Sequence, residues 1–121
     1  MNTNYARTRG ASDADRKEMQ RLTLQLKLRE QQEELADCHS LLDQLSFARD
    51  KEATLLRGLT RRAELHALAA IDDIEQALAR LDNGTYAQCV RCDGDIGDSR
   101  LEVLPLTRHC VGCASTTRRS T

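Results

Sequence analysis

Apolar side chains recur every three or four residues from about Asp13 to Ser46 of this 121-residue chain. Such steps place side chains on one face of an α-helix, as in a heptad repeat. Three more apolar residues, Met19, Leu22 and Leu26, are expected to widen this face near its start. The repeating positions are Leu24, Leu28, Gln31, Leu35, Cys38, Leu42 and Leu45. The pattern therefore predicts a long helix that packs along one face.

A second helical pattern runs from about Glu52 to Leu81. Gly58 interrupts this pattern, at a cost of about 1 kcal/mol relative to Ala. The positions expected on its buried face are Leu56, Ala63, Ala67, Ala70, Ile74, Ala77 and Leu81, flanked by Ile71 and Leu78. Because small side chains let helices approach closely, we expect this alanine-rich face to pack against the first helix.

The two patterns meet where the periodicity breaks, at residues 46–53, although neither Gly nor Pro lies there. Each helix has roughly 30 residues and a length of about 45 Å, at about 1.5 Å per residue. Asn83–Gly84 suits the left-handed conformation that ends many helices. We therefore predict a mainly α fold, in which an antiparallel two-helix coiled-coil hairpin spans residues 13–82 with its tip near 46–53.

Four of the five cysteines form two C-x-x-C pairs, Cys89 with Cys92 and Cys110 with Cys113, that are separated by 17 residues. Each pair presents two thiolates to one ion, and four thiolates complete a tetrahedral zinc shell. A closed shell leaves no place for water or substrate. We therefore expect one structural Zn²⁺ in a small four-cysteine zinc-finger module over residues 83–114.

Other interpretations of the cysteines stay open. The pairs are redox-active dithiols in one alternative, and in another the zinc thiolates also respond to oxidants. Cys38, the fifth cysteine, fits a small core residue of the first helix. Between the pairs, a short strand or an apolar patch is expected from Leu101, Val103, Leu104 and Leu106.

Composition and charge narrow the function classes. The formal net charge is −1, and residues 1–12 carry +2, residues 13–48 carry −3, and the rest sum to zero. A dedicated nucleic-acid binder usually shows a basic excess on one face, so a protein partner is the better expectation.

Residues 1–12 are polar and expected to be disordered, and residues 115–121 are expected to form a short tail. No apolar signal core or membrane span is visible, so we expect a cytoplasmic protein. We also expect a monomer.

Two acidic residues, Asp50 and Glu52, lie close together in the predicted tip. A solvated turn explains them without any function. Alternatively, the hairpin delivers a carboxylate pair to a distant site, where it acts on a metal-bound centre or a moving loop.

The hairpin followed by this cysteine module resembles the DksA/TraR family of bacterial transcription regulators. The residues that carry the resemblance lie in about 78–113 and include GTYAQCVRCDGDIGDSRLEVLPLTRHCVGC, at positions 84–113. They comprise the four cysteines, a relaxed Gly-Asp-Ile-Gly element at 94–97, the run that begins at Arg100, and the single proline, Pro105. Over residues 13–77 the resemblance is one of architecture and length.

The resemblance implies a non-enzymatic regulator that binds RNA polymerase directly, without contacting DNA. In the family, the zinc module and the base of the hairpin hold the rim of the secondary channel, and the tip enters the channel. The result is an altered stability of promoter open complexes. Carried over to this chain, Arg100 of the zinc module and the tip residues Asp50, Glu52 and Ala53 are partner-binding residues.

This chain departs from the family pattern at several positions. The family's tip has an Asp followed two residues later by Ala, whereas Ala53 follows Asp50 by three. Family members that bind ppGpp use basic side chains at positions that hold Asp73, Leu104 and Ala114 here. Because phosphates gain strongly from Lys or Arg, we expect a weak or absent ppGpp response, unless Arg100 or Arg108 compensates. Longer members have a C-terminal helix where only eight residues follow Cys113 here.

Three function classes are therefore kept. The first is the RNA polymerase regulator. The second is a Gre-like transcript-cleavage factor or channel competitor, in which Asp50 and Glu52 hold a second Mg²⁺. The third is a zinc-linked or redox-sensing adaptor. An enzyme in its own right is not expected, because no nucleophile–base set or open metal site is visible.

Overall fold

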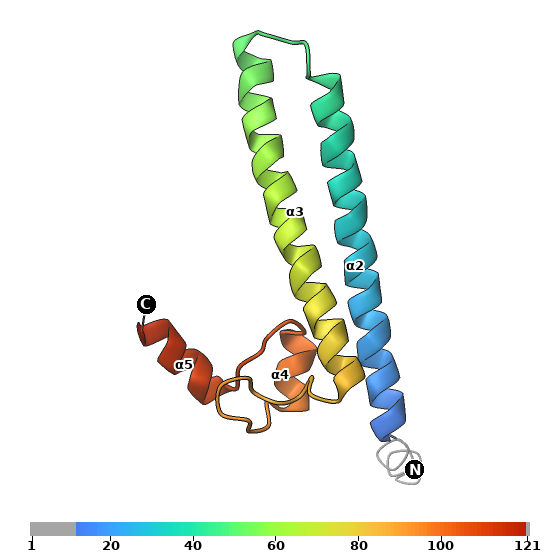
Figure 1. Ribbon diagram of the computed structural model, residues 1–121, viewed down its shortest axis with the longest axis vertical. Helices are drawn as coiled ribbons and strands as arrows, with labels where there is room; N and C mark the ends of the chain where they lie inside the picture. The colour runs from blue at the N-terminus through green and yellow to red at the C-terminus, as the bar shows by residue number, and fades with distance from the viewer. Residues whose placement is uncertain (1–11, 121) are drawn as a thin grey trace. The chain divides into compact units, whose positions relative to one another are not determined.

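The computed structural model describes residues 12–120, which form four helices (Figure 1). The helices are α2 (Ser12–Gln44), α3 (Lys51–Asn83), α4 (Asp98–Val103) and α5 (Val111–Ser120). The described residues form no β-sheet, and a single antiparallel bridge joins Gln88 to Asp95. The predicted mainly α fold, with two long packed helices and a four-cysteine module, is confirmed. The disorder expected over residues 1–12 lies outside the described residues except at Ser12.

The chain divides into two compact units, and α2 and α3 each run through both. We call residues 25–75 the hairpin unit. The finger unit comprises residues up to 24 and from 76 onward. None of the described helices combines the length and the apolar character that crossing a membrane requires.

The hairpin unit buries mostly small side chains between α2 and α3, which run antiparallel (Figure 1). Its buried residues are Cys38, Ala53, Thr60, Ala67 and Ile74. Leu28, Gln31, Leu35, Leu42 and Leu45 of the predicted α2 stripe are half-buried. Small residues on α3 therefore face larger ones on α2, as the two patterns predict.

The predicted stripe is wrong at the start of α3. Leu56 is 41% exposed, whereas Ala53 and Thr60 are buried and Arg57 is half-buried. These three residues follow one another at steps of four and three, so they share a face that excludes Leu56. The buried Thr60 hydroxyl donates to the Leu56 carbonyl (2.7 Å), which satisfies a polar group inside the seam. Met19, Leu22 and Leu26 are also exposed and do not widen the α2 face.

The finger unit has a small core of its own. Its buried side chains are Leu24, Ala77, Leu81, Tyr86, Cys89, Ile96 and Leu101. The Tyr86 hydroxyl donates to the Pro105 carbonyl (2.6 Å), which ties the start of the module to the segment after α4. Burial raises the pKa of Tyr86, so the ring remains a neutral donor.

A left-handed glycine ends α3 at the place that the sequence predicts. Gly84 has a φ of 79°, and the Thr85 N–H donates to the Arg80 carbonyl (2.9 Å). This bond and the left-handed glycine form the usual C-terminal cap of a helix. In the same unit Arg21 pairs with Asp82 (2.5 Å) and Arg16 pairs with Asp98 (3.2 Å), so two ion pairs link the first turns of α2 to α3 and α4.

One local expectation is corrected, and another gains structural detail. The segment around Leu101 is the helix α4 and not a strand. Leu101 is buried, Leu106 is half-buried, and Val103 and Leu104 are exposed. The short tail expected over 115–121 is helical as far as Ser120, because α5 continues through it. Beyond Gly112 no Gly or Pro interrupts that helix.

Candidate metal centre and hairpin tip

The four cysteines of the finger unit meet at one point. Their sulfur atoms, from Cys89, Cys92, Cys110 and Cys113, all lie within 4.8 Å of one another. The Cys92 and Cys110 sulfurs are 3.8 Å apart. A tetrahedral zinc ion with Zn–S bonds of about 2.3 Å separates its ligands by about 3.8 Å. The cluster therefore has the size of a four-thiolate zinc shell.

A tight turn positions the first cysteine pair. The Cys89 N–H donates to the Gly94 carbonyl (2.8 Å), and the Asp93 N–H donates to the Cys89 carbonyl (2.9 Å). Asp93 has a φ of 63°, a left-handed conformation that Asp tolerates better than most residues. The Gly94 N–H points at the Cys92 sulfur (3.4 Å), and a Cβ on Gly94 would lie 3.3 Å from that sulfur. Glycine at position 94 thus lets the backbone approach a metal ligand closely.

The second pair sits at the start of α5. The Cys113 N–H faces the Cys110 sulfur (3.5 Å), and the Ala114 N–H donates to the Cys110 carbonyl (2.9 Å). The Val90 N–H, in the first turn, donates to the Arg108 carbonyl (2.9 Å). This bond connects the two halves of the module beside the sulfur cluster.

The thiols do not titrate alike, because their surroundings differ. Burial acts to raise the pKa of Cys89, but N–H groups of Cys110, Cys92 and Arg91 outweigh it and lower this pKa to about 6. The hydrogen bond to Cys110 raises the pKa of Cys113 to about 12. Backbone N–H groups that donate to a sulfur favour the thiolate, which is the form that binds a metal ion.

Arg100 holds the module together from within. Its side chain is half-buried, and its Nε donates to the His109 carbonyl (3.0 Å), one residue before Cys110. The Thr107 hydroxyl donates to the same carbonyl (3.2 Å). The residue predicted to contact a partner therefore also fixes the segment that leads into the second cysteine pair.

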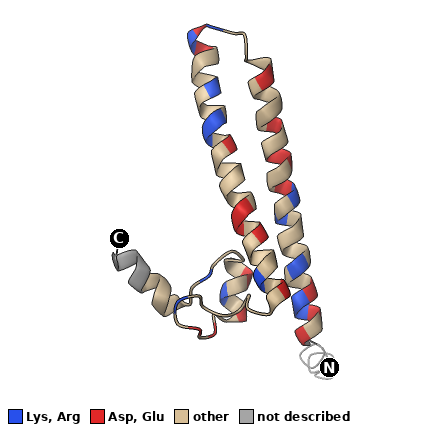
Figure 2. Ribbon diagram, in the orientation of Figure 1, with Lys and Arg blue, Asp and Glu red and all other residues tan. Residues whose placement is uncertain are grey.

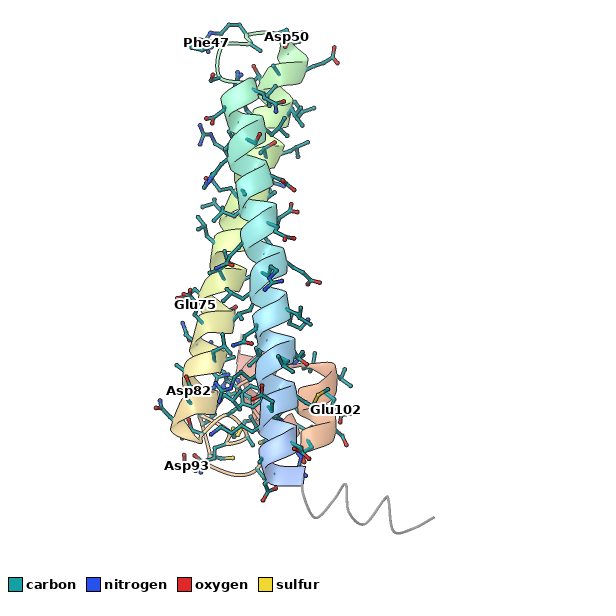
Figure 3. All side chains as sticks on the ribbon, turned by 90° about the vertical axis from the view of Figure 1, so that its right-hand side faces the viewer. Phe47, Asp50, Glu75, Asp82, Asp93 and Glu102 are labelled. Atoms are coloured by element: carbon teal, nitrogen blue, oxygen red, sulfur yellow. The ribbon has the colours of Figure 1, made fainter. Side chains whose placement is uncertain are left out.

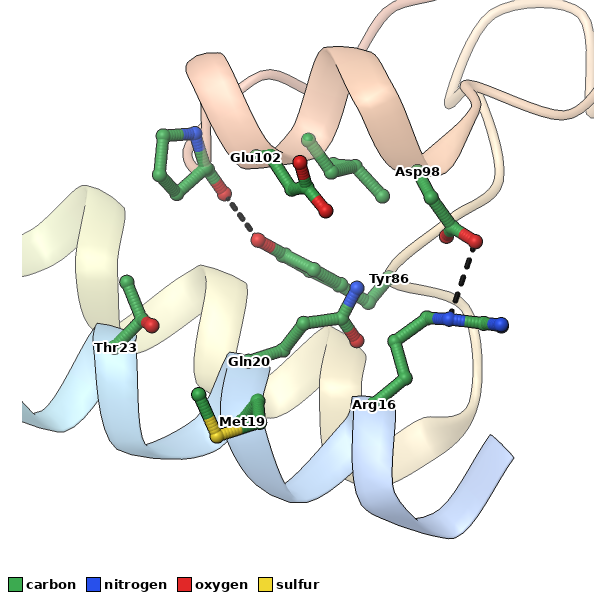
Figure 4. A pocket seen from close by; sticks show the side chains of 9 residues that line it. Arg16, Met19, Gln20, Thr23, Tyr86, Asp98 and Glu102 are labelled. Carbon is green, nitrogen blue, oxygen red and sulfur yellow. Dashed lines mark hydrogen bonds and ion pairs between the residues drawn. The ribbon is translucent and has the colours of Figure 1, made fainter. Parts of the chain in front are cut away.

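A groove of about 410 Å³ lies between the first turns of α2 and α4 in the finger unit (Figure 4). Tyr86 and Leu101 line it and also belong to the core. Arg16, paired with Asp98, lies at its edge (Figure 4). The groove is thus a depression over the core between α2 and α4. None of the four clustered cysteines lines it.

In the hairpin unit, Asp50 caps the first turn of α3. Its Oδ1 accepts a hydrogen bond from the Ala53 N–H (2.9 Å), the usual contact of a helix N-cap. Asp50 and Glu52 are both exposed, whereas Ala53 is buried against α2. The structure therefore brings the two predicted acidic residues to the surface of the tip and places the predicted alanine inside the helix pair.

Arg57 closes the turn between the helices. Its Nη1 donates to the carbonyls of Leu45 (2.6 Å) and Ala48 (2.7 Å). The Ser46 hydroxyl donates to the Asp43 carbonyl (2.8 Å) at the end of α2. The turn is therefore fixed by side chains, which explains how the chain reverses without Gly or Pro. In the sequence, Arg57 looks like an ordinary cation on the surface of a helix. No motif or spacing there indicates that it contacts the turn.

The sequence reasoning also missed Phe47. This side chain is 89% exposed and lies in the turn, near Asp50 (Figure 3). The signal that could have found it is its type, since it is the chain's single phenylalanine and falls where the helical periodicity breaks.

The three positions expected to lack a ppGpp contact carry no positive charge. Asp73 and Leu104 are exposed, and Ala114 is half-buried. Arg100 is bonded to a backbone carbonyl, and Arg108 donates to the Gln76 side chain (3.1 Å). Both candidate compensating arginines thus already have partners within the finger unit.

Comparisons with known proteins agree with this geometry. Residues 84–118 match the family model of the prokaryotic dksA/traR C4-type zinc finger. An uncharacterized protein of Aquifex aeolicus (strain VF5) is 38% identical over 52 residues, which cover 43% of this chain and 36% of that protein. The matched part is therefore about a third of the relative's length.

The structure of transcription factor DksA2 from Pseudomonas aeruginosa has the same fold. The TM-score is 0.82, the sequence identity is 22%, and the match covers 89% of this chain and 87% of that one. A C4-type finger whose four sulfurs cluster in this way holds one structural zinc ion. The finger at residues 84–118 thus matches the dksA/traR C4-type zinc-finger family, and the chain that carries it has the fold of the DksA2 structure.

Proposed function

We propose that this protein is a transcription regulator that binds RNA polymerase directly. The observation that carries the proposal is the DksA/TraR C4-type finger at residues 84–118, on the fold of a transcription factor. The hairpin tip would enter the secondary channel, and the finger would hold the channel rim. Its effect would be a change in the lifetime of promoter open complexes.

The charge of the finger supports a protein partner over DNA. Residues 83–114 contain three arginines and four acidic residues, so this segment carries a net charge of −1. Affinity for nucleic acid comes mostly from lysine and arginine contacts to phosphates. We therefore propose that the regulator acts without binding DNA itself. We also propose that it is a cytoplasmic monomer with no catalytic activity of its own.

The zinc ion has a structural part in this proposal. Cys89, Cys92, Cys110 and Cys113 are the proposed ligands, and their four thiolates would fill the tetrahedral shell. A filled shell supplies no position for substrate, so the metal would organise the finger for binding. Arg100 would contribute by fixing the backbone before Cys110, in addition to any contact with the polymerase.

The tip supports an electrostatic action in the channel. Asp50 and Glu52 are exposed, and the turn that carries them is fixed by Arg57. A preorganised carboxylate acts on nearby cations at little entropic cost. We propose a ppGpp response that is weak or absent, since Asp73, Leu104 and Ala114 offer no cation to a phosphate.

The test is the lifetime of an open complex between bacterial RNA polymerase and a ribosomal RNA promoter, with and without the zinc-loaded protein. We expect the protein to shorten this lifetime severalfold, and ppGpp to change the effect by less than about twofold. Stimulated cleavage of backtracked RNA would instead indicate a Gre-like factor. Failure to bind the polymerase would contradict the proposal and favour the zinc or redox adaptor.

A further inference from the structure

The apolar ring of Phe47 is exposed to solvent, an unfavourable environment for an aromatic side chain. It is the chain's one phenylalanine, it is 89% exposed, and it projects from the turn at the end of the hairpin unit (Figure 3). Tyr86, by contrast, is buried in the finger core. Aromatic side chains are enriched among the residues that dominate binding energy at protein interfaces.

The backbone on both sides of Phe47 is held in place. Arg57 donates to the carbonyl two residues before it and to the carbonyl one residue after it, at 2.6 and 2.7 Å. Ser46, its neighbour, is bonded back to α2, and Asp50 caps α3 three residues later. Because the backbone of the turn is already fixed, binding through the ring costs little backbone entropy.

The charges around the ring favour a protein partner over a nucleic acid. Arg49 and Lys51 alternate with Asp50 and Glu52, so the tip is electrically neutral (Figure 2). A phosphate backbone would be attracted by a basic excess, which is absent here. A rigid aromatic side chain with balanced charges beside it fits an apolar pocket of a protein that has polar edges.

We propose that Phe47 is the principal binding residue of the tip and inserts into an apolar pocket of RNA polymerase. Arg57 is a positioning residue that acts through Phe47 by fixing the turn. This inference rests on the proposed function, because it names the side chain through which the tip engages that partner. Asp50 and Glu52 then supply charge beside a contact that the ring makes.

The test compares two exposed apolar side chains of the hairpin unit. Phe47→Ala removes the ring, and Leu65→Ala is the matched control, because Leu65 is 67% exposed on α3. We expect Phe47→Ala to raise the concentration needed for half-maximal shortening of open-complex lifetime by at least about tenfold. Leu65→Ala should change it by less than about twofold, and both variants should keep the wild-type melting temperature.

A double-mutant cycle tests the role of Arg57. Arg57→Ala should raise the half-maximal concentration, and adding it to Phe47→Ala should cost nothing further, since its effect passes through the ring. Additive losses would overturn the positioning role. Circular dichroism at 222 nm checks that each variant retains its helices.

Crosslinking supplies a readout that does not depend on activity. A benzoylphenylalanine placed at position 47 should crosslink to the polymerase, whereas the same group at position 65 should not. Equal crosslinking at both positions, or an unchanged half-maximal concentration for Phe47→Ala, would overturn the inference and leave the proposed function standing. A wild-type protein without effect on the polymerase would overturn both. Phe47-dependent dimerisation in solution, seen by gel filtration, would assign the ring to a second copy of the chain and also overturn it.

Discussion

The finger unit and the hairpin unit use different means to hold functional groups in place. In the finger, four cysteine sulfurs that lie within 4.8 Å of one another form the site for one zinc ion, and the surrounding core is small. In the hairpin, a seam of small side chains on α3 packs against α2, and one arginine closes the turn. The finger therefore depends on a metal for its order, while the tip depends on helix packing and hydrogen bonds.

Removing a zinc ligand should have the largest effect and should be confined to the finger. Cys110→Ser is expected to abolish the binding of one zinc per chain, because a structural four-cysteine site loses its closed shell. Zinc content by elemental analysis checks this. Cys38→Ala is the control, since Cys38 is buried in the hairpin unit, is not one of the four clustered cysteines, and its loss should leave the zinc content unchanged.

This difference between the two units would be contradicted if Cys110→Ser also unfolded the hairpin unit. We expect α2 and α3 to retain most of the helical signal at 222 nm in that variant. A loss of nearly all helicity would show that the helix pair depends on the metal.

The hairpin should instead respond to the loss of one large buried side chain. Ile74 is 1% exposed, and Ile74→Ala is expected to lower the free energy of unfolding by about 2–4 kcal/mol through lost burial and a cavity. Urea unfolding measures the change. Leu68→Ala, at a side chain that is 45% exposed, should cost less than about 1 kcal/mol. Equal losses would contradict the packing assigned to this seam.

The cap at Asp50 allows charge and structure to be separated. Asp50→Ala removes the acceptor for the Ala53 N–H and should destabilise the hairpin by about 1 kcal/mol. Asp50→Asn keeps an oxygen at that place and should change stability by less than about 0.5 kcal/mol. If thermal unfolding shows the two variants to be equally destabilised, the capping role is wrong.

Replacing Gly58 is expected to have the smallest effect on stability, and it should stabilise the protein rather than destabilise it. It lies inside α3, is exposed, and has no atom within 4 Å of where a Cβ would be placed. Gly58→Ala should therefore raise the free energy of unfolding by about 0.5–1 kcal/mol. Gly94→Ala is the contrasting change, because its Cβ would crowd the Cys92 sulfur and should weaken zinc retention. A stabilised Gly94→Ala or a destabilised Gly58→Ala would reverse this comparison.

The sequence predicts the finger better than the tip, for a physical reason. Metal ligation demands particular residue types at fixed spacing, so Cys89 and its three partners are visible in one sequence. The α2 seam is equally visible, because burial enforces a period of three to four residues. At the start of α3 the period alone does not fix which face turns inward, and Leu56 was assigned to the wrong one.

The turn itself could not be predicted in detail. It is closed by Arg57, a residue nine positions after Ala48, and contacts of that kind leave no periodic or local signal. The capping role of Asp50 differs, because Asp is a preferred N-cap residue and so gives a local signal, but its charge suggested a functional group instead. The exposure of Phe47 follows from this turn geometry, and so it emerges only from the structure.

The most direct test of the account measures binding and effect separately in one variant. Asp50→Asn with Glu52→Gln removes both negative charges of the tip and preserves the cap. Polymerase affinity should stay within about threefold of wild type, since the finger and Phe47 are intact, while the shortening of open-complex lifetime should be largely lost. A double variant that shortens the lifetime as well as wild type would contradict the proposed action of the acidic tip.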